Sequence, residues 1–266
     1  MQNKLYEVIM FIDVHAHYDD EKFTKDIHEV LTGLKEKNIN TVINAGTNAV
    51  SSQKSIDLAK KYDFLYGCCG IHPHDSHSYK DDLPVIEKLL TNEKCVAIGE
   101  TGLDYYYENT PRDIQQESFR AHMELAVKYK LPIVIHNRDS TRDCIDIIKE
   151  YKQLSVQGLF HCFSGGPETA KTVLDIGYYI SIGGPVTFKN ARKTIETVKY
   201  VPLDRLLTET DCPYLSPEPK RGTRNDSGNI PLIVKKIAEI KCLSEDTVIN
   251  TVLLNARNLF NKINIK

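Results

Sequence analysis

Several common features are missing from this 266-residue sequence. Its seven cysteines contain no CxxC pair and no paired spacing, which argues against a disulfide framework. No apolar run reaches the length of a membrane span, and the first residues, MQNKLYEVIMFIDV, contain no clear hydrophobic region followed by a cleavage site. We therefore expect a cytoplasmic protein with reduced cysteines, no membrane association and no obligate protein partner.

A strong charge of either sign is also absent. The formal net charge is −2, so the overall charge does not indicate nucleic-acid binding, and any phosphate recognition has to be local. Hydrophobic residues form 41% of the chain, enough to fill a core. No linker, low-complexity tract or repeat divides the sequence. We expect residues 1–266 to form one domain, with residues 1–9 as a short N-terminal extension.

Strand-like apolar runs alternate with amphipathic helical patterns along the chain. The strand-like runs lie at 11–17, 40–46, 64–73, 95–104, 132–139, 158–166, 178–184 and 205–213, and helical patterns lie at 55–62, 83–91, 115–129, 141–151, 167–177, 230–241 and 244–260. Eight such strands predict an α/β fold, a (β/α)8 or TIM barrel, with a doubly wound open sheet as the alternative. The barrel is favoured because only a closed barrel places the ends of the first and eighth strands in one ring.

Chemically reactive side chains gather at the ends of six of these predicted strands. They are His15, His17, His72, His74, Glu100, His136, Arg138, His161 and Asp211. Because the carboxyl ends of barrel strands form one rim, these side chains are expected to meet there. His28 and His122, by contrast, are assigned to surface helices.

Six of these side chains have the chemistry of a metal centre. They are His15, His17, Glu100, His136, His161 and Asp211. His15 and His17 are separated by two positions on one strand and so share a face. Each residue alone could be a hydrogen-bonded core residue, but four imidazoles and two carboxylates together suit two divalent cations. Glu100 can bridge, since a carboxylate offers one oxygen to each ion.

The remaining polar candidates are assigned to the substrate. His72, His74 and Arg138 are placed to bind phosphate oxygens. Arg221 and Arg224 would contact the substrate further out, although a solvated loop is equally consistent with their sequence context.

Two groups of residues near these positions are interpreted mainly as packing residues. Tyr105, Tyr106 and Tyr107 follow the fourth strand, where one of them could stack on a base, but packing is favoured. Cys162 and Cys212 flank ligand candidates and point to the opposite face in an extended chain.

With these motifs established, the chain resembles the TatD family of metal-dependent deoxyribonucleases. The resemblance rests on FIDVHAHYD, GIHPH, AIGETGLDYYY, LPIVIHNRDS, FHCFSGG and LTETDCPYLSP, in matching order over nearly the whole length. RGTRNDS is similar to the family's late arginine–asparagine segment, but Asp226 and Ser227 stand before the later Pro231 and depart from the pattern. The resemblance implies an amidohydrolase-type barrel whose metal ligands correspond to the six residues above. It also implies magnesium-dependent 3′–5′ exonuclease cleavage of single-stranded DNA.

We therefore predict a metal-dependent deoxyribonuclease with two divalent ions, the choice among Mg, Zn and Mn being open. Asp211 is the predicted base for the attacking water and Glu100 the second catalytic carboxylate. One alternative is an amidohydrolase-type C–N or ester hydrolase acting on a cyclic amide or an aminoacyl ester. The other is a barrel with a purely structural or binding role. None of the reactive strand ends carries a lysine that could be carboxylated to bridge metals, which favours the nuclease.

Overall fold

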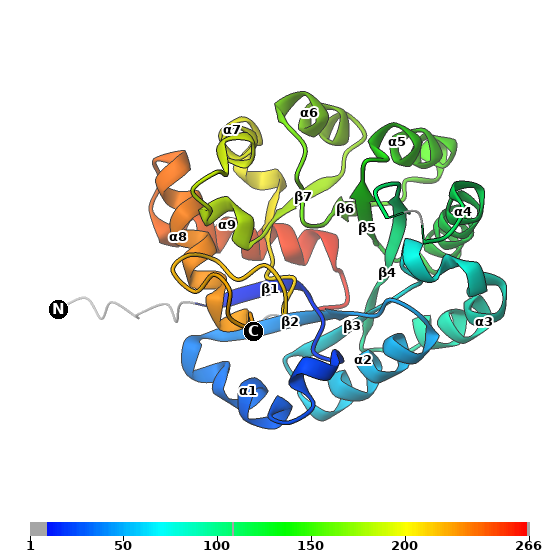
Figure 1. Ribbon diagram of the computed structural model, residues 1–266, viewed down its shortest axis with the longest axis horizontal. Coiled ribbons are helices and arrows are strands. Elements are labelled where there is room, and N and C mark those ends of the chain that lie inside the picture. The colour runs from blue at the N-terminus through cyan, green and yellow to red at the C-terminus, as the bar shows by residue number, and fades with distance from the viewer. Residues whose placement is uncertain (1–9, 108, 265–266) are drawn as a thin grey trace.

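The computed structural model describes residues 10–107 and 109–264. Within them, eight parallel strands pair in chain order to form one sheet. The strands are β1 (Phe11–Ala16), β2 (Ile39–Ala45), β3 (Leu65–Cys69), β4 (Cys95–Asp104), β5 (Ile133–Arg138), β6 (Gly158–Phe160), β7 (Tyr179–Ile182) and β8 (Leu206–Thr208). The ring of strands with helices outside is a TIM barrel (Figure 1), which confirms the predicted fold.

The barrel closes between β1 and the segment that follows β8. Ala16 forms a parallel bridge with Cys212. Asp13, fully buried on β1, accepts hydrogen bonds from the backbone and hydroxyl of Thr210 and from the hydroxyl of Ser227. A buried carboxylate has to be satisfied in this way to avoid a large desolvation penalty. The closure excludes the open-sheet alternative.

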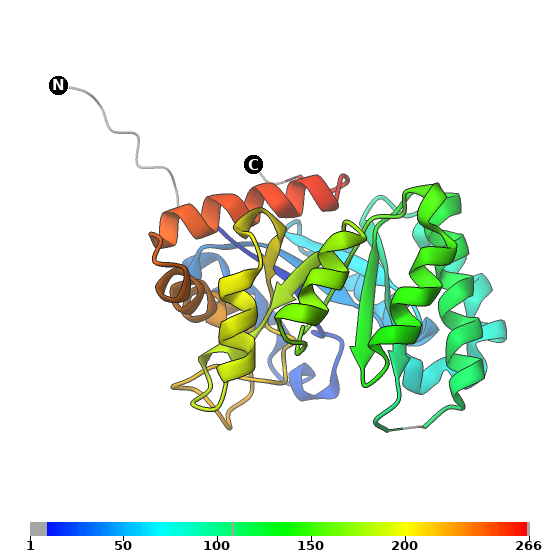
Figure 2. The ribbon, with the colours of Figure 1, turned by 90° about the horizontal axis from the view of Figure 1, so that it is seen from above.

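Helices surround the strands on the outside (Figure 1). They are α1 (Ile27–Gly33), α2 (Ala49–Lys61), α3 (Tyr79–Leu90), α4 (Arg112–Tyr129), α5 (Thr141–Glu150), α6 (Pro167–Asp175), α7 (Arg192–Tyr200), α8 (Ile230–Lys241) and α9 (Glu245–Leu259). The last helix lies across the end of the barrel where the strands begin (Figure 2). There Asn255 donates hydrogen bonds to the carbonyls of Leu203 and Leu206, next to the start of β8. This end of the barrel is covered, so the opposite end is the one open to a ligand.

Two helices, α1 and α7, were not predicted from the sequence. Leu31 is the only buried residue of α1 among its described side chains, and α7 buries only Thr197 and Val198. Ile27, Val30 and Leu31 do occur at helical spacing in α1 and pack against the core. With seven residues in α1 and nine in α7, however, the segments are shorter than the window in which helical periodicity is recognised. Packing of Leu31 and Val198 into the hydrophobic core stabilises the two helices.

His122 corrects a second expectation, because its ring is fully buried on the barrel side of α4 rather than exposed. Its Nε2 accepts a hydrogen bond from the backbone N–H of Ile71 (3.1 Å), and its Nδ1 donates to the carbonyl of Ser118 (2.7 Å). Acceptance by Nε2 requires the neutral imidazole, and burial lowers the pKa of His122 to about 4. The ring therefore ties α4 to the segment after β3.

All seven cysteines are free thiols. No described helix combines the length and hydropathy needed to cross a bilayer. The predicted extension, residues 1–9, lies outside the described residues.

Candidate metal centre

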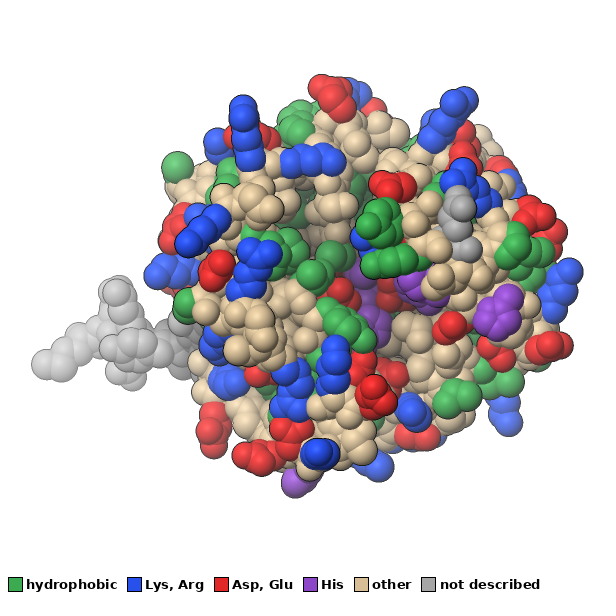
Figure 3. All heavy atoms as spheres, in the orientation of Figure 1, with side chains coloured by type: hydrophobic (Ala, Val, Ile, Leu, Met, Phe, Trp, Pro, Cys, Tyr) green, Lys and Arg blue, Asp and Glu red, His purple; other side chains and the backbone are tan. Residues whose placement is uncertain are grey.

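A cavity of about 860 Å³ opens at the C-terminal ends of the strands. The surface view shows a hollow in the centre of this face with histidine side chains inside it (Figure 3). Eight of the predicted site residues line the cavity: His17, His72, His74, Glu100, His136, Arg138, His161 and Asp211. His15 lies beneath them, fully buried, with its ring stacked on that of His161 at 3.9 Å between centroids. Barrel closure thus brings together residues that are up to 196 positions apart, Asp211 and His15.

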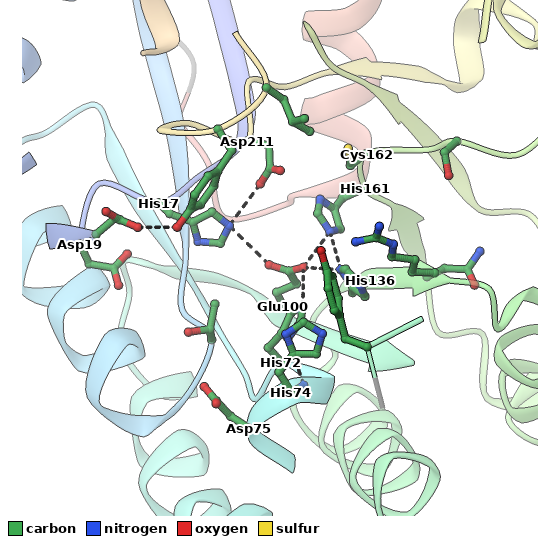
Figure 4. Close-up of a pocket in the computed structure, with 18 residues that line it drawn as sticks. His17, Asp19, His72, His74, Asp75, Glu100, His136, His161, Cys162 and Asp211 are labelled. Carbon is green, nitrogen blue, oxygen red and sulfur yellow. Dashed lines mark hydrogen bonds and ion pairs between the residues drawn. The ribbon is translucent and has the colours of Figure 1, made fainter. Parts of the chain in front are cut away.

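Glu100 occupies the centre of this group (Figure 4). Its Oε2 lies 3.2 Å from Nε2 of His15 and 3.4 Å from Nε2 of His17. Its Oε1 lies 2.8 Å from Nδ1 of His136 and 2.8 Å from Nε2 of His161. The two carboxylate oxygens therefore face two different sets of imidazoles, which is the arrangement a bridging ligand requires.

Asp211 projects into the cavity from a left-handed turn after β8. Its φ of 57° is a conformation that aspartate tolerates better than most residues. The backbone N–H of Asp211 donates to the carbonyl of His15 (2.9 Å), which fixes the turn against β1. Oδ1 of Asp211 then lies 3.3 Å from Nε2 of His17. Because β8 ends at Thr208, earlier than predicted, this turn rather than the strand directs the carboxylate.

The donor atoms fit a divalent cation. Three overlapping groups have ligand atoms within 4.8 Å of one another: His15, His17 and Glu100; His15, His161 and Asp211; and His72, Glu100 and His136. Nε2 of His15 and Nε2 of His17 face each other at 3.1 Å, while Nδ1 of His17 is engaged by the carbonyl of Ala45 (2.9 Å). Converging imidazole nitrogens whose far nitrogen is held by a backbone carbonyl are typical of metal-ligating histidines. The third group also includes His72, which the sequence had assigned to phosphate binding.

The charges of this cluster keep its carboxylates ionised. Burial by itself raises the pKa of Glu100, but the charges of His161 and His72 and the hydrogen bond from His136 outweigh it, and that pKa lies well below its usual range. Burial opposes the charged form of His17, yet the hydrogen bond with Asp211 and the charge of Glu100 raise its pKa to about 9. Anionic carboxylates surrounded by histidines form a site that exchanges protons for metal cations.

Asp104, at the end of β4, is a site residue that the sequence reasoning missed. Its side chain is 1% exposed, and its Oδ2 lies 3.0 Å from Nε2 of His74 and 3.0 Å from Nε2 of His136. Its Oδ1 accepts the backbone N–H groups of Tyr106 and Tyr107. Asp104 therefore positions His74 and His136 and also the turn that carries Tyr106 and Tyr107, here called the tyrosine turn. The signal was present, since a carboxylate ending an apolar strand is the feature that singled out Glu100.

Glu209 was also missed. It is fully buried, accepts a hydrogen bond from the backbone N–H of Cys162, and lies 3.7 Å from Nδ1 of His161. It thus stands behind His161, on the side of the ring away from Glu100. The sequence TETD contains two acidic residues two positions apart, and only Asp211, the more exposed of them, was predicted to be a site residue.

The two loop arginines do not line the cavity. Arg224 donates to both carboxylate oxygens of Asp26, at 2.8 and 2.6 Å, and the guanidinium of Arg221 lies over the ring of Phe188. The structure therefore does not bring these two predicted substrate-binding residues to the site.

Three residues interpreted as packing residues lie instead at the cavity or its rim. Cys162 lines the cavity because β6 ends at Phe160, and alternation no longer directs a residue beyond a strand end. Tyr106 and Tyr107 are 58% and 53% exposed, whereas Tyr105 is half-buried and donates its hydroxyl to Asp143. The packing interpretation is wrong for Cys162, Tyr106 and Tyr107.

Comparison with known proteins decides the family. Residues 12–261 match the family model described as TatD related DNase. The chain belongs to this TatD family. It is 41% identical over 252 residues to the metal-dependent hydrolase YabD of Bacillus subtilis, covering 94% of this chain and 99% of that protein. A metal-dependent hydrolase of Methanocaldococcus jannaschii, MJ1582, is 34% identical over 96% of this chain and 98% of its own length.

The crystal structure of the TatD homologue YjjV from Escherichia coli superposes on this TatD-family chain with a TM-score of 0.90. The identity is 28%, over 96% of this chain and 99% of the other. The TatD-family protein described here is thus a metal-dependent hydrolase, with a histidine and carboxylate cluster able to bind metal at the open end of the barrel.

Proposed function

We propose that this protein hydrolyses the phosphodiester bonds of DNA, as a 3′–5′ exonuclease acting on single strands through two divalent cations. The observation that carries the proposal is the position of Glu100, whose two oxygens face two separate sets of imidazoles at 2.8–3.4 Å. The family model, described as TatD related DNase, supports DNA as the substrate. A cavity of about 860 Å³ has the size of a small-ligand site, suited to the end of a strand.

The ligands of the two ions are assigned from the same distances. His15, His17 and Asp211 would hold one ion, His136 and His161 would hold the other, and Glu100 would bridge them. His72 lies 3.5 Å from Glu100 and would border the second ion. When bound, the ions would lower the pKa of the attacking water and neutralise charge on the phosphate.

Side chains of the protein supply the remaining steps. Asp211 accepts the proton of the attacking water. Burial raises the pKa of Asp211, but the hydrogen bond and charge of His17 outweigh it and hold that pKa below its usual range, so the carboxylate is ionised and carries no proton of its own. His74 and Arg138 line the cavity and bind phosphate oxygens. Because α9 covers the end of the barrel where the strands begin, the substrate can approach only at the opposite rim, where these groups converge.

A product analysis tests the proposal. Protein dialysed against a chelator is incubated with Mg²⁺, Mn²⁺ or Zn²⁺ and a 5′-labelled single-stranded DNA, and the products are resolved on a denaturing gel. We expect a ladder of 3′-shortened products only with a divalent ion, and less cleavage of a 3′-blocked strand, of duplex and of matched RNA. The Asp211→Asn variant, purified in parallel, controls for contaminating nucleases.

Amide and ester substrates are assayed beside the oligonucleotide. Hydrolysis of a cyclic amide or an aminoacyl ester, with the oligonucleotide left intact, would contradict the proposed nuclease and favour the C–N or ester hydrolase.

A further inference from the structure

Two adjacent tyrosines form an exposed aromatic surface beside the candidate metal centre. Tyr106 and Tyr107, here called the tyrosine ledge, lie in the turn after β4, which ends at Asp104, and Tyr107 lines the cavity. More than half of each side chain is exposed, although both rings are large and apolar. Contiguous exposed apolar surface marks binding sites more often than single exposed side chains do, so an adjacent pair of rings at the mouth of a cavity indicates a ligand surface.

The ledge is held in place despite its exposure. Both backbone N–H groups donate to Asp104, at 3.0 and 3.1 Å, and the two rings meet edge to face at 4.8 Å between centroids. The guanidinium of Arg138 lies 3.9 Å from the ring centroid of Tyr106 and 4.7 Å from that of Tyr107. A surface that is fixed before binding loses little conformational entropy when it takes a flat ligand.

The ledge is also in direct contact with the reactive histidines. The ring of Tyr107 meets that of His74 edge to face at 5.4 Å between centroids. His74 in turn shares Oδ2 of Asp104 with His136. A chain of direct contacts thus runs from Tyr107 through His74 and Asp104 to His136, the ring that faces Glu100.

Charge on the rim favours a polyanion on the side of the ledge. Arg138 is exposed and pairs with no carboxylate in the described part of the chain. Asp19, Asp20 and Asp75 line the cavity from the ends of β1 and β3, where they would repel phosphate groups. A nucleic acid strand is thus directed past Arg138 and over Tyr107.

We propose that Tyr107, supported by Tyr106 and Arg138, stacks on the nucleobase of the nucleotide whose phosphate is cleaved. The inference rests on the proposed nuclease function and adds to it the residue that selects the substrate. Only an unpaired base offers its face to an aromatic ring, whereas bases in a duplex are stacked on one another. Selection of single strands is then a property of the ledge and not of the metal ions.

The experiment compares two single-stranded DNAs that differ only at the 3′-terminal nucleotide, one normal and one abasic. We expect the wild-type protein to cleave the normal strand with a kcat/KM about tenfold or more above that of the abasic strand, the effect typical of one stacked base. Tyr107→Ala should remove this preference, and Tyr107→Phe, which keeps the ring, should retain it. Tyr200→Ala is the matched control, because Tyr200 is 47% exposed on α7 and does not line the cavity.

Two results would contradict base stacking on Tyr107 without contradicting the proposed nuclease function. They are equal cleavage of the two strands by the wild-type protein, or an unchanged preference for the normal strand in Tyr107→Ala. Cleavage of neither strand would contradict the proposed function instead. In that case, binding of fluorescent versions of both strands is measured by anisotropy in chelator, where no hydrolysis is needed. Tighter binding of the normal strand that Tyr107→Ala abolishes would support the ledge, and equal binding would reject it.

Discussion

Asp104 lies 3.0 Å from Nε2 of His136, while Nδ1 of the same ring lies 2.8 Å from Glu100. A carboxylate behind a histidine takes the N–H of that ring, which leaves the lone pair on the other nitrogen free for a metal. The pair therefore fixes both the tautomer and the orientation of His136 toward the cavity. A carboxylate outside the predicted ligand set thus controls a residue inside it.

Replacing Asp104 tests this relationship. Asp104→Asn removes the charge that orients His136, and we expect metal affinity to fall about 10- to 100-fold. Isothermal titration with Mn²⁺ or Zn²⁺ measures this without any substrate. Asp175→Asn, which removes only an exposed ion pair with Lys171, is the control. An Asp104→Asn protein with wild-type metal affinity would show that Asp104 serves the tyrosine turn alone.

Asp211→Asn should abolish most turnover while leaving the fold intact. The amide is nearly the same size as the carboxylate but cannot accept the proton of water, so we expect kcat to fall about 10²- to 10⁴-fold. Cleavage of single-stranded DNA gives the rate, and circular dichroism verifies folding. Turnover close to that of wild type would refute the role of Asp211 as base.

Divalent ions should raise the thermal stability of the protein. Ions that bind only the folded state add about 2.7 kcal/mol at a hundredfold excess over their dissociation constant, which corresponds to an increase in Tm of at least a few degrees. Differential scanning fluorimetry with and without chelator measures the shift. His15→Ala combined with His136→Ala should lose it. A Tm that stays the same with every divalent ion tested would contradict a metal centre.

His122 should make stability depend on pH. Its pKa is about 4 in the folded protein against about 6.5 in the unfolded chain, so its contribution is present above pH 6.5 and is lost as the pH falls toward 4. Between pH 7 and pH 5 the linkage amounts to about 2 kcal/mol. Urea unfolding at both values in chelator should show a steeper loss for wild type than for His122→Gln, and equal losses would mean that the ring is protonated when folded.

Arg138 and Arg224 should respond differently to removal. Arg138→Ala is expected to raise KM for single-stranded DNA and to lower the salt dependence of binding by about one phosphate contact. Arg224→Ala breaks the solvent-accessible ion pair with Asp26 and should lower stability only slightly, with little change in KM. Oligonucleotide titrations at several salt concentrations separate the two. An equal effect of both variants on KM would place Arg224 at the substrate after all.

The sequence failed where a residue's role depends on what lies opposite to it. His122, Arg224 and Tyr107 each occur in a segment whose own pattern is uninformative about partners. His122 is buried where it accepts a hydrogen bond from Ile71, and Arg224 pairs with Asp26, two partners that are distant in the chain. Tyr107 is exposed because it lies at the mouth of the cavity, which only the tertiary structure forms. Helical or strand periodicity reports only which face of its own element a residue occupies.

The sequence alone predicted parallel strands buried on both faces, because apolar runs alternate with amphipathic helices, and the reactive residues at the ends of the first and eighth strands favoured a closed barrel over an open sheet. It also predicted that His15, Glu100 and Asp211 reach the carboxyl-end rim, although Glu100 lies within β4 and Asp211 lies three residues beyond the end of β8. Only the tertiary structure decided which groups lie in contact. It placed different histidines at the two carboxylate oxygens of Glu100, placed Asp104 beside Nε2 of His136, and left the ring of Tyr107 exposed. The physical reason is that closing the ring of strands and ending them at particular residues sets distances between elements that no local pattern encodes.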